Sequence, residues 1–486
     1  MSAVPRPITL DKPVRRLAAQ ALSRAAGAPL IGGNTVDLLI DARANFAAWL
    51  TALRGARQRI LLENYIIRDD DVGREFRAVL VERAESGVRV CVVCDWMGCL
   101  GQSRPAFWQP LLDAGGSVRT YNPLHWQNPF GWINRDHRKL LLVDRDVAFL
   151  GGLCLSARWL GDARRNVPPW RDTAVAIRGP ALLEVEQAFA DIWAQLGTPL
   201  PPFGAEEPAT VGDVDVRIIA TQPDTAGVFR LDQMIAALAQ RTLWLADAYF
   251  VGLSPYVQAL GAAARDGVDV RLLVPGTSDL PVVRAMSRAG YRPLLEQGVR
   301  VFEWNGSMMH AKTAVADGRW ARVGSSNLNV ASWLGNCEID VAVEDIAFAQ
   351  RMEQQYLSDL DNATEIVLAA RRIRGTRAQH APRGSGSSSR ATASALRLAH
   401  SVGAAFTDRQ TLPSETAGLP WIALLVCLVA ALAFVFPRLL AWPLAAMAAW
   451  VGIAMLVRYA RARARRRRKP PSPTPASDAA KISGAP

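Results

Sequence analysis

The chain carries one series of sequence patterns twice, and this duplication restricts the possible folds more than any other feature. In each copy, short apolar runs of strand length alternate with longer segments in which apolar residues recur at helical spacing. The matching segments are 59–67 with 242–250, 87–96 with 267–276, and 137–156 with 310–329. Strand–helix–strand units of this kind build parallel or mixed sheets with helices on their faces. The sequence therefore predicts an α/β protein made of two related repeats.

Changes in composition predict where the repeats begin and end. A proline-rich break after residue 197 separates the two copies, and a stretch rich in Arg, Ser, Ala and Gly follows the second copy. The predicted parts are an N-terminal extension at 1–29, repeat 1 at 30–197, a linker at 198–210, repeat 2 at 211–370, a basic flexible linker at 371–418, two transmembrane helices at 419–457 and a basic cytoplasmic tail at 458–486.

Two uncharged stretches close to the C-terminus predict a membrane hairpin. Residues 420–436 and 439–457 contain no charged side chain, and only a Pro-Arg pair separates them. Each stretch is close to the length that crosses a bilayer. A buried soluble hairpin is the alternative, but lipid-facing helices need no polar face and these stretches have none. Because arginine-rich segments stay in the cytoplasm, the cluster at 458–468 places the tail and the repeats on the cytoplasmic side.

The charge of the chain favours an anionic partner. The formal net charge is +12, and much of the excess lies after residue 370. Basic runs attract either nucleic acid or an anionic membrane surface. Because these runs flank the predicted membrane segment, they favour anionic membrane lipids and argue against nucleic acid.

The six cysteines give no sign of a metal or redox centre. Cys91 and Cys94 form a C-x-x-C pair, a spacing that occurs in zinc and redox sites. The pair lies within an apolar strand-like run, where Cys packs as a small apolar residue, and no second pair or nearby histidine completes a set of four ligands. We therefore expect free thiols, a reducing compartment, and no metal or cofactor.

Histidine and lysine recur together in the matching segments. Only two of the five lysines lie between residues 30 and 370, and each follows a histidine by two residues and precedes an aspartate by five. The two motifs, written H-x-K-x4-D, consist of His137, Lys139 and Asp144 in repeat 1 and of His310, Lys312 and Asp317 in repeat 2. On a strand, residues two apart point to the same face. Each histidine and its lysine are therefore predicted to project together.

Two such pairs in one protein predict a phosphate site. A lysine ammonium is a compact charge that suits a phosphate oxygen, and an imidazole serves as nucleophile or proton donor near neutral pH. If the repeats meet around a two-fold axis, one histidine attacks phosphorus while the other protonates the departing alcohol. The lysines then balance the charge of the transition state, and the scheme needs no metal. A single histidine at a strand end would favour a structural role, but two matched sites do not.

The two motifs, each followed by a glycine and a small residue, resemble the signature of the phospholipase D superfamily. The segments at 61–76 and 170–182 further resemble bacterial cardiolipin synthases, and the whole resemblance covers roughly residues 32–360. It implies a duplicated phospholipase D-type α/β/α sandwich around one active site. The predicted transmembrane helical hairpin then follows this sandwich at the C-terminus.

The resemblance also implies roles for individual residues. It implies a covalent phosphohistidine intermediate, with His137 as nucleophile and His310 as acid by analogy, although the sequence leaves this order open. Each histidine would be oriented by a carboxylate about thirty residues further along, where Asp172 and Glu338 lie in matching positions. The aspartates of the motifs, which would be structural supports that bond nearby backbone or side chains, are Asp144 and Asp317.

Repeat 1 departs from the family pattern just after its motif. The family usually has Asn a few residues after the glycine, and repeat 2 has Ser325 and Asn327 in this segment. Repeat 1 has Gly152 and Cys154 instead, and a thiol is a weaker hydrogen-bond donor than an amide. We therefore expect the half-site of repeat 1 to hold a phosphate less well.

The resemblance implies a cardiolipin synthase-like phosphatidyltransferase. Such an enzyme moves a phosphatidyl group to phosphatidylglycerol, in a bacterial inner membrane with the catalytic repeats in the cytoplasm. One alternative is a phospholipase D-type phosphodiesterase that hydrolyses phospholipid or nucleic acid, because water then replaces the alcohol in the second step. Another, suggested by Cys154, is a membrane-organising protein with weak catalysis. The donor lipid and the oligomeric state stay open.

Two further segments have both a functional and a structural interpretation. Residues 125–135 bring aromatic side chains next to the first motif, where they would line an acyl-chain entrance or pack as a loop. Arg284 and Arg288 lie one turn apart on a predicted helix, where they would hold a second phosphate or form a solvated face.

Overall fold

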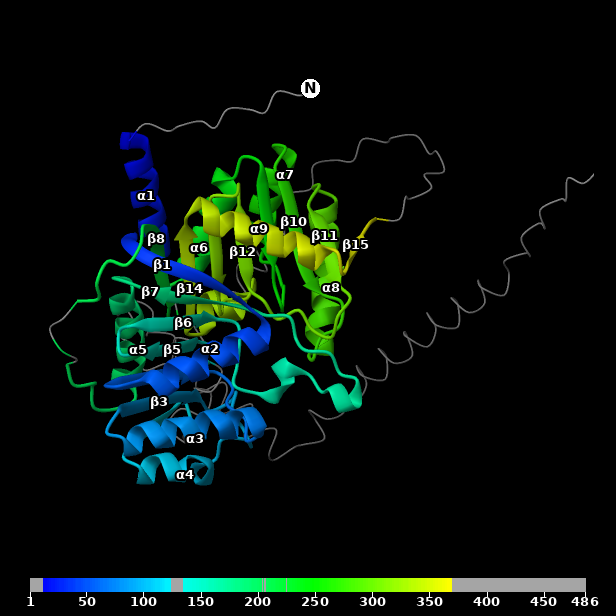
Figure 1. The fold of residues 1–486 in the computed structure, drawn as a ribbon. Coiled ribbons are helices and arrows are strands. Elements are labelled where there is room, and N and C mark those ends of the chain that lie inside the picture. Colours follow the sequence, from blue (N-terminus) through cyan, green and yellow to red (C-terminus); the bar gives the residue numbers. More distant parts are fainter. Residues whose placement is uncertain (1–11, 124–133, 203, 205–206, 224, 369–486) are drawn as a thin grey trace, which may run out of the picture. The chain divides into compact units, whose positions relative to one another are not determined.

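The computed structural model describes residues 12–123, 134–202, 204, 207–223 and 225–368 (Figure 1). The helices and strands up to the end of repeat 1 are α1 Lys12–Ala26, β1 Ile31–Ile40, α2 Asp41–Gly55, β2 Arg59–Asn64, α3 Asp71–Glu85, β3 Arg89–Asp95, α4 Pro105–Asp113, β4 Ser117–Tyr121, β5 Lys139–Val143, β6 Val147–Gly151, η2 Ala157–Leu160, η3 Ala163–Arg165, β7 Thr173–Arg178 and α5 Leu182–Gln195. Those of repeat 2 are β8 Val214–Thr221, α6 Gly227–Leu238, β9 Thr242–Ala246, α7 Ser254–Arg265, β10 Asp269–Pro275, α8 Pro281–Leu295, β11 Arg300–Trp304, β12 Thr313–Ala316, β13 Trp320–Gly324, η4 Ala331–Gly335, β14 Glu338–Glu344, α9 Ile346–Leu360 and β15 Ala363–Ile366.

Each repeat contributes strands in the same order to one mixed sheet. The order is β1-β7-β6-β5-β2-β3-β4 in repeat 1 and β8-β14-β13-β12-β9-β10-β11 in repeat 2, with β15 at the outer edge. The strands β2, β3 and β4 pair in parallel, as do their counterparts β9, β10 and β11. The first strands of the repeats, β1 and β8, pair antiparallel at the centre, which relates the repeats by an approximate two-fold axis. The predicted mixed α/β fold is therefore confirmed.

Helices cover the sheet of each repeat and close three apolar cores. Helices α2, α3 and α4 close a core of repeat 1, and α6, α7 and α8 close a core of repeat 2. Helix α1, from the segment predicted as an extension, packs into the core of repeat 2. The third core joins α5 and α9 with strands of both repeats. Burial of apolar surface is the main favourable term in folding, so this shared core holds the two repeats together.

Within the described ranges, no helix has both the length and the apolar character needed to cross a bilayer. The predicted hairpin at 419–457 lies outside those ranges, as do the predicted linker at 371–418 and the predicted tail at 458–486.

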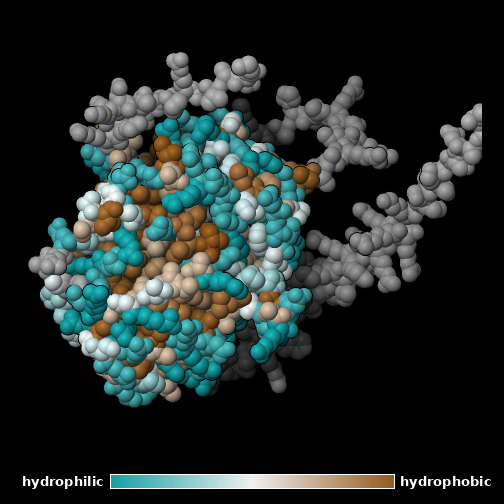
Figure 2. Space-filling view, in the orientation of Figure 1, coloured by the Kyte–Doolittle hydropathy of each residue, from teal (hydrophilic) through white to brown (hydrophobic). Residues whose placement is uncertain are grey.

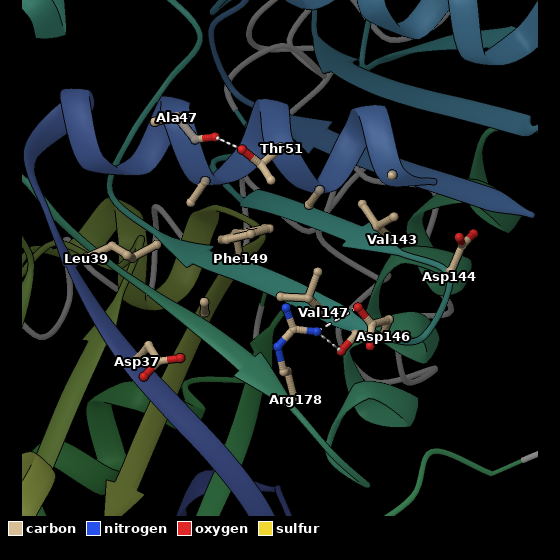
Figure 3. A pocket seen from close by; sticks show the side chains of 14 residues that line it. Asp37, Leu39, Ala47, Thr51, Val143, Asp144, Asp146, Val147, Phe149 and Arg178 are labelled. Carbon is tan, nitrogen blue, oxygen red and sulfur yellow. Dashed lines mark hydrogen bonds and ion pairs between the residues drawn. The ribbon is translucent and has the colours of Figure 1, made fainter. Parts of the chain in front are cut away.

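One face of repeat 1 is open where the matching face of repeat 2 is covered. A cavity of about 670 Å³ lies between α2 and strands β1, β6 and β7 (Figure 3), and apolar residues gather over these strands in Figure 2. In repeat 2, α1 lies in the matching place, where the guanidinium of Arg217 donates to the carbonyl of Ala19 and pairs with Glu344. The matching residues of repeat 1, Asp37 and Arg178, line the open cavity. Among the described residues, no histidine or lysine lines this cavity, so the motif residues meet elsewhere.

Candidate active site

The H-x-K motifs stand at the beginning of two equivalent buried strands. Lys139 begins β5, Lys312 directly precedes β12, and each histidine comes two residues earlier. Every residue of both strands is buried, so the apolar run after each lysine fixes the strand within the sheet. The two strands bring His137 and His310 to one pocket of about 570 Å³.

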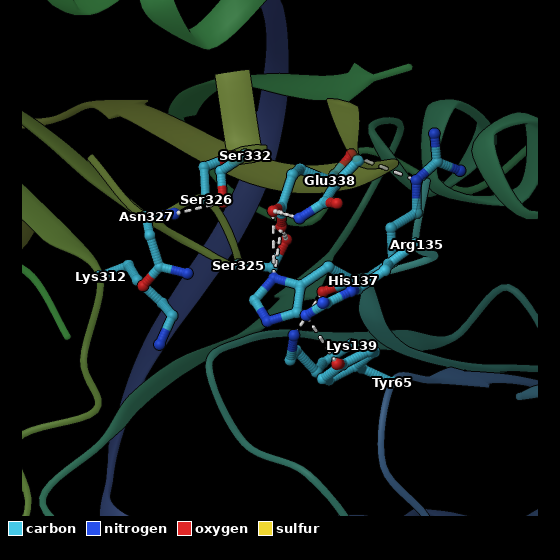
Figure 4. Close-up of polar contacts among 12 residues, drawn as sticks. Tyr65, Arg135, His137, Lys139, Lys312, Ser325, Ser326, Asn327, Ser332 and Glu338 are labelled. Carbon is cyan, nitrogen blue, oxygen red and sulfur yellow. Dashed lines mark hydrogen bonds and ion pairs between the residues drawn. The ribbon is translucent and has the colours of Figure 1, made fainter. Parts of the chain in front are cut away.

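Each histidine is oriented by a carboxylate of the opposite repeat. Nδ1 of His137 lies 2.9 Å from Oε2 of Glu338 (Figure 4), and Nδ1 of His310 lies 2.8 Å from Oδ2 of Asp172. The expectation that each histidine uses the carboxylate about thirty residues further along in its own repeat is therefore wrong. The two carboxylates have exchanged partners.

Backbone contacts between the repeats explain this exchange. The N–H of His137 donates to the carbonyl of Cys337 at 2.9 Å, and the N–H of His310 donates to the carbonyl of Arg171 at 2.7 Å. The backbone of each histidine is thus hydrogen-bonded to the residue that directly precedes the carboxylate of the other repeat. These bridges form only when the repeats fold against each other, and no local sequence pattern marks them.

Both imidazoles are neutral in the unliganded site. Burial is the largest cause that lowers the pKa of His137 well below its usual value, and the charge of Lys139 adds to it. Burial and Lys312 lower the pKa of His310 to about 4. A carboxylate oxygen that accepts from Nδ1–H holds the imidazole proton on Nδ1 and leaves the lone pair of Nε2 available. A neutral imidazole in this tautomer is a competent nucleophile.

The two carboxylates differ in their ionisation. Burial raises the pKa of Glu338 to about 7. Burial alone would raise the pKa of Asp172 too, but the charge of His310 and its hydrogen bond outweigh it and lower that pKa. Because Asp172 is the more readily ionised carboxylate, it is the better partner for an imidazolium.

The groups that support the carboxylates also differ, for a steric reason. Oγ of Ser325 donates to Glu338 at 2.6 Å, whereas Nε1 of Trp159 donates to Asp172 at 2.7 Å. Repeat 1 has Gly152 at the position of Ser325, and a Cβ there would lie 2.1 Å from Oδ1 of Asp172. The close carboxylate leaves no room for a side chain, and a tryptophan donates in place of the serine. The role of Trp159 as a hydrogen-bond donor to Asp172 could not be predicted, because no motif marks this residue.

The two lysines are buried beside their histidines. Nζ of Lys312 lies 3.1 Å from both ring nitrogens of His310 and donates to the His310 carbonyl at 2.5 Å. Lys139 donates in the same way to the carbonyl of His137. Burial lowers the pKa of Lys139, and it lowers the pKa of Lys312 to about 8. In the described part of the chain neither lysine pairs with a carboxylate, so the site has cationic groups that an anionic ligand would satisfy.

The aspartates of the motifs make the supporting contacts that the resemblance implies. Asp144 and Asp317 begin the turns after β5 and β12 with φ of 52° and 54°, a left-handed conformation that Asp tolerates. Asp144 accepts from the N–H groups of residues 57–59 at 2.6 to 2.9 Å, and Asp317 from those of 240–242 at 2.7 to 2.9 Å. These bonds tie each motif strand to the start of β2 or β9, which explains the fixed spacing within the motif.

Asn327 and Cys154 line the pocket from matching positions. Oδ1 of Asn327 is buried and has no hydrogen-bond partner within the described residues. Burial raises the pKa of the Cys154 thiol to about 11, so the thiol stays protonated. The half-site of repeat 1 therefore has a weaker donor at this position, in line with the sequence.

Aromatic side chains that the sequence analysis did not single out surround the histidines. The ring centroid of Tyr65 lies 4.8 Å from that of His137, and those of Tyr249 and Trp159 lie 5.8 Å and 5.2 Å from that of His310. Both tyrosines follow the matching strands β2 and β9, but Tyr65 matches Ala248 and Tyr249 matches Ile66, so the duplication does not mark them. Aromatic rings around the histidines lower the local dielectric constant, and electrostatic interactions between nearby charged groups are stronger there.

The remaining predicted features lie outside this pocket or outside the described residues. Arg288 pairs with Glu303 at 2.7 Å, and neither Arg284 nor Arg288 lines the pocket. Of the predicted aromatic segment, residues 125–133 are not described, and Arg135 donates to the hydroxyl of Tyr65 at 3.3 Å. All cysteines within the described ranges are free thiols, and no cluster suited to a metal ion occurs among those residues.

Comparisons with known proteins agree with this geometry. A family model described as "Cardiolipin synthase, PLD-like domain" matches residues 49–193 and 231–360. Cardiolipin synthase A of Pseudomonas entomophila (strain L48) is 33% identical over 356 residues, which cover 72% of this chain and 73% of that protein. The cardiolipin synthase of Alkalihalophilus pseudofirmus is 32% identical over 346 residues, which cover 70% of this chain and 68% of that protein.

A solved structure of another enzyme has a similar fold. The phosphatidylserine synthase of Haemophilus influenzae Rd KW20 matches with a TM-score of 0.53 and covers 71% of this chain and 91% of its own. The sequences are 14% identical, so this likeness concerns the fold alone.

Proposed function

Because the chain belongs to the family of phospholipase D-like cardiolipin synthases, we propose that it transfers a phosphatidyl group to phosphatidylglycerol through a phosphohistidine. One observation carries this proposal. Two histidines line one pocket, and each is held by a carboxylate of the opposite repeat. Two histidines in one pocket supply both a nucleophile and an acid for the exchange of alcohols at phosphorus.

In the first step, Nε2 of His137 attacks the phosphorus of the donor lipid. The bond between phosphorus and the headgroup oxygen breaks, and His310 gives its Nε2 proton to that oxygen. The assignment of nucleophile and acid follows from the two environments. The lowered pKa of His137 keeps its Nε2 unprotonated, whereas the ionised Asp172 supports the imidazolium of His310. The anionic phosphodiester favours the same protonation of His310 when it enters the pocket.

In the second step, a hydroxyl of phosphatidylglycerol attacks the phosphorus of the phosphohistidine. His310 takes the proton of this hydroxyl, the bond between phosphorus and Nε2 breaks, and His137 regains its lone pair. The product is cardiolipin. When the donor is itself phosphatidylglycerol, the alcohol released in the first step is glycerol.

The lysines and Asn327 suit the charge that develops during both steps. Charge in phosphoryl transfer spreads over the equatorial oxygens, and donors placed in advance stabilise it. Lys139 and Lys312 are buried beside the histidines, and Asn327 lines the same pocket. Aromatic side chains on both histidines keep the site dry enough for these charges to act strongly.

The substrates of this reaction are lipids, so the site has to work at a membrane. We place the enzyme in a bacterial inner membrane, anchored by the predicted hairpin at 419–457, with both repeats in the cytoplasm. The basic segments on both sides of the hairpin would bind anionic lipid headgroups.

Lipid analysis of bacterial cells that lack cardiolipin tests the function directly. We expect cells that express this chain to accumulate cardiolipin, and cells that express His137→Ala or His310→Ala to contain none. His400→Ala changes a histidine outside the repeats and should behave like the wild type. A folded wild-type protein without cardiolipin would refute the proposal, and phosphatidic acid in its place would favour the hydrolase.

A further inference from the structure

Three arginines of repeat 1 line the catalytic pocket without a place in the scheme above, and one of them, Arg135, donates to the hydroxyl of Tyr65. The other two are Arg68, which lies in the loop after β2, and Arg158, which lies on η2. The backbone holds these two segments together, because the N–H of Arg68 donates to the carbonyl of Leu155 and the N–H of Leu155 donates to that of Ile66, both at 3.0 Å. The scaffold therefore brings both guanidinium groups to one wall of the pocket.

The matching wall of repeat 2 has the same scaffold with apolar side chains. The N–H of Val251 donates to the carbonyl of Leu328 at 3.1 Å, which is the counterpart of the bond between Arg68 and Leu155. Val251 thus matches Arg68, and Ala331 matches Arg158. Further apolar residues line this side, namely Leu280, Val283, Met286 and Val330. The lining from repeat 1 thus carries arginines at two positions where repeat 2 has apolar side chains, although Asp279 of repeat 2 also lines the pocket.

The two arginines lack an acidic partner. Among the described residues, neither guanidinium makes an ion pair or a hydrogen bond. The charge of the nearby Asp70 carboxylate acts to raise the pKa of Arg68, but Asp70 forms no ion pair with it and instead accepts from the N–H of Gly73 at 3.1 Å, from Oγ of Ser156 at 3.0 Å and from the N–H of Ala157 at 2.8 Å.

The two guanidinium groups also act on each other. Partial burial lowers the pKa of Arg68, and the charge of Arg158 is the next largest cause. Two like charges this close repel each other, and an anion between them removes the repulsion. Guanidinium groups bind phosphate oxygens in pairs of hydrogen bonds, so a phosphodiester fits this wall chemically.

We propose that Arg68 and Arg158 form a second anion subsite, which binds the phosphate of the acceptor phosphatidylglycerol. The inference rests on the proposed function, in which the donor phosphorus lies between the two histidines. The acceptor then brings its own phosphodiester, linked through glycerol to the attacking hydroxyl. The apolar lining residues of repeat 2, among them Val283 and Met286, then contact the acyl chains. Water and simple alcohols have no such phosphate, so the subsite favours transfer over hydrolysis.

Kinetics of the purified full-length protein in mixed micelles test this subsite. In the double variant Arg68→Gln/Arg158→Gln, we expect the KM for phosphatidylglycerol as acceptor to rise at least about tenfold, because charge-assisted hydrogen bonds are lost. We also expect the ratio of cardiolipin to phosphatidic acid to fall. Arg68→Lys/Arg158→Lys should restore part of both. Arg164→Gln, on η3 and outside the pocket lining, is the matched control and should change neither quantity.

Two results would overturn the subsite while the proposed function stands. One is an unchanged KM and product ratio in the double variant, and the other is an equal fall of cardiolipin and phosphatidic acid. A wild-type protein that forms no cardiolipin would instead refute the proposed function.

Binding without turnover separates the subsite from the reaction. In His137→Asn, which cannot form the covalent intermediate, calorimetric titration with short-chain phosphatidylglycerol should give two phosphodiester sites. Adding Arg68→Gln/Arg158→Gln should leave one. One site in both proteins would contradict the inference, whatever the activity of the wild type.

Discussion

The half-sites of repeat 1 and repeat 2 present histidine and lysine in the same way but surround them with different groups. In both, a buried strand carries the pair, a backbone bridge to the other repeat fixes the histidine, and an aspartate ties the turn. The matching positions that differ include Gly152 and Ser325, Cys154 and Asn327, Asp172 and Glu338, and Arg68 and Val251. The shared features position the histidine and lysine of each half-site. The differing ones divide the work between the two histidines.

The division appears most clearly in the carboxylates. Glu338 has a pKa raised to about 7 by burial and holds His137, whereas Asp172 has a lowered pKa and holds His310. The partner of His137 orients the ring with little added charge. The partner of His310 also stabilises a positive ring. An approximate two-fold axis thus builds a site that is symmetric in geometry and asymmetric in acidity.

Exchanging each histidine for glutamine gives the largest expected effect. His137→Gln removes the nucleophile and should lower kcat by at least about 10⁴-fold. His310→Gln removes the acid and should lower it by about 10² to 10⁴-fold. Rates of cardiolipin formation by the purified protein measure both. Equal losses, or a greater loss in His310→Gln, would break the proposed division.

The carboxylates provide a sharper version of the same comparison. Asp172→Asn removes the charge that stabilises the imidazolium of His310, so we expect kcat to fall by about 10² to 10³-fold. Glu338→Gln keeps a polar partner for His137, which needs little charge, so the expected fall is about tenfold. The ratio of the two kcat values is the readout. The reverse ranking would assign the roles of the histidines the other way round.

The pH dependence of stability between pH 4.5 and pH 7 distinguishes the two carboxylates independently of catalysis. The pKa of Glu338 rises from 4.5 to about 7 on folding. The contribution of this group to the free energy of unfolding is therefore fully present below about pH 4.5 and is lost as the pH rises to about 7. The pKa of Asp172 is lowered from 3.8, so its contribution is present above that pH and is lost only at more acidic pH.

The decline of the melting temperature from pH 4.5 to pH 7 should therefore be smaller by several degrees in Glu338→Gln than in the wild type. In Asp172→Asn the decline over this range should equal that of the wild type. Thermal unfolding followed by circular dichroism measures both variants. An unaltered decline in Glu338→Gln would contradict the raised pKa of this carboxyl group.

The smallest expected effect concerns the weaker donor of repeat 1. Cys154→Asn gives repeat 1 the amide that repeat 2 has at Asn327, and one further hydrogen bond to the phosphate should raise kcat/KM up to about tenfold. Cys154→Ala, which offers no donor, is the control and should not raise it. An increase of kcat/KM in both variants would show that the size of the side chain at position 154, and not its ability to donate a hydrogen bond, limits the rate.

Much of the fold and part of the site could be predicted from the sequence. The duplication predicts two α/β repeats, and the spacing in H-x-K places His137 and Lys139 on one face of a strand. The supporting role of Asp144 was implied by the family resemblance, and its contacts show that the fixed spacing reflects a turn that recurs in both repeats. These features depend on residues close together in the chain.

Features that depend on contacts between the repeats could not be predicted. The exchange of carboxylates follows from the bonds of His137 to Cys337 and of His310 to Arg171, which join residues more than 130 positions apart. The proposed anion subsite likewise depends on Arg68 and its neighbour on η2, which have no common motif. A pattern read along the chain contains no information on which strand ends meet across the two-fold axis.

Trapping the covalent intermediate tests the central claim most directly. The protein is mixed with short-chain phosphatidylglycerol, quenched in denaturant at mildly alkaline pH, which spares both the P–N bond and the acyl esters, and digested for peptide mapping by mass spectrometry. We predict a phosphatidyl adduct on His137 in the wild type, the same adduct in His310→Gln, and none in His137→Gln. An adduct on His310, or turnover without an adduct on either histidine, would contradict the account.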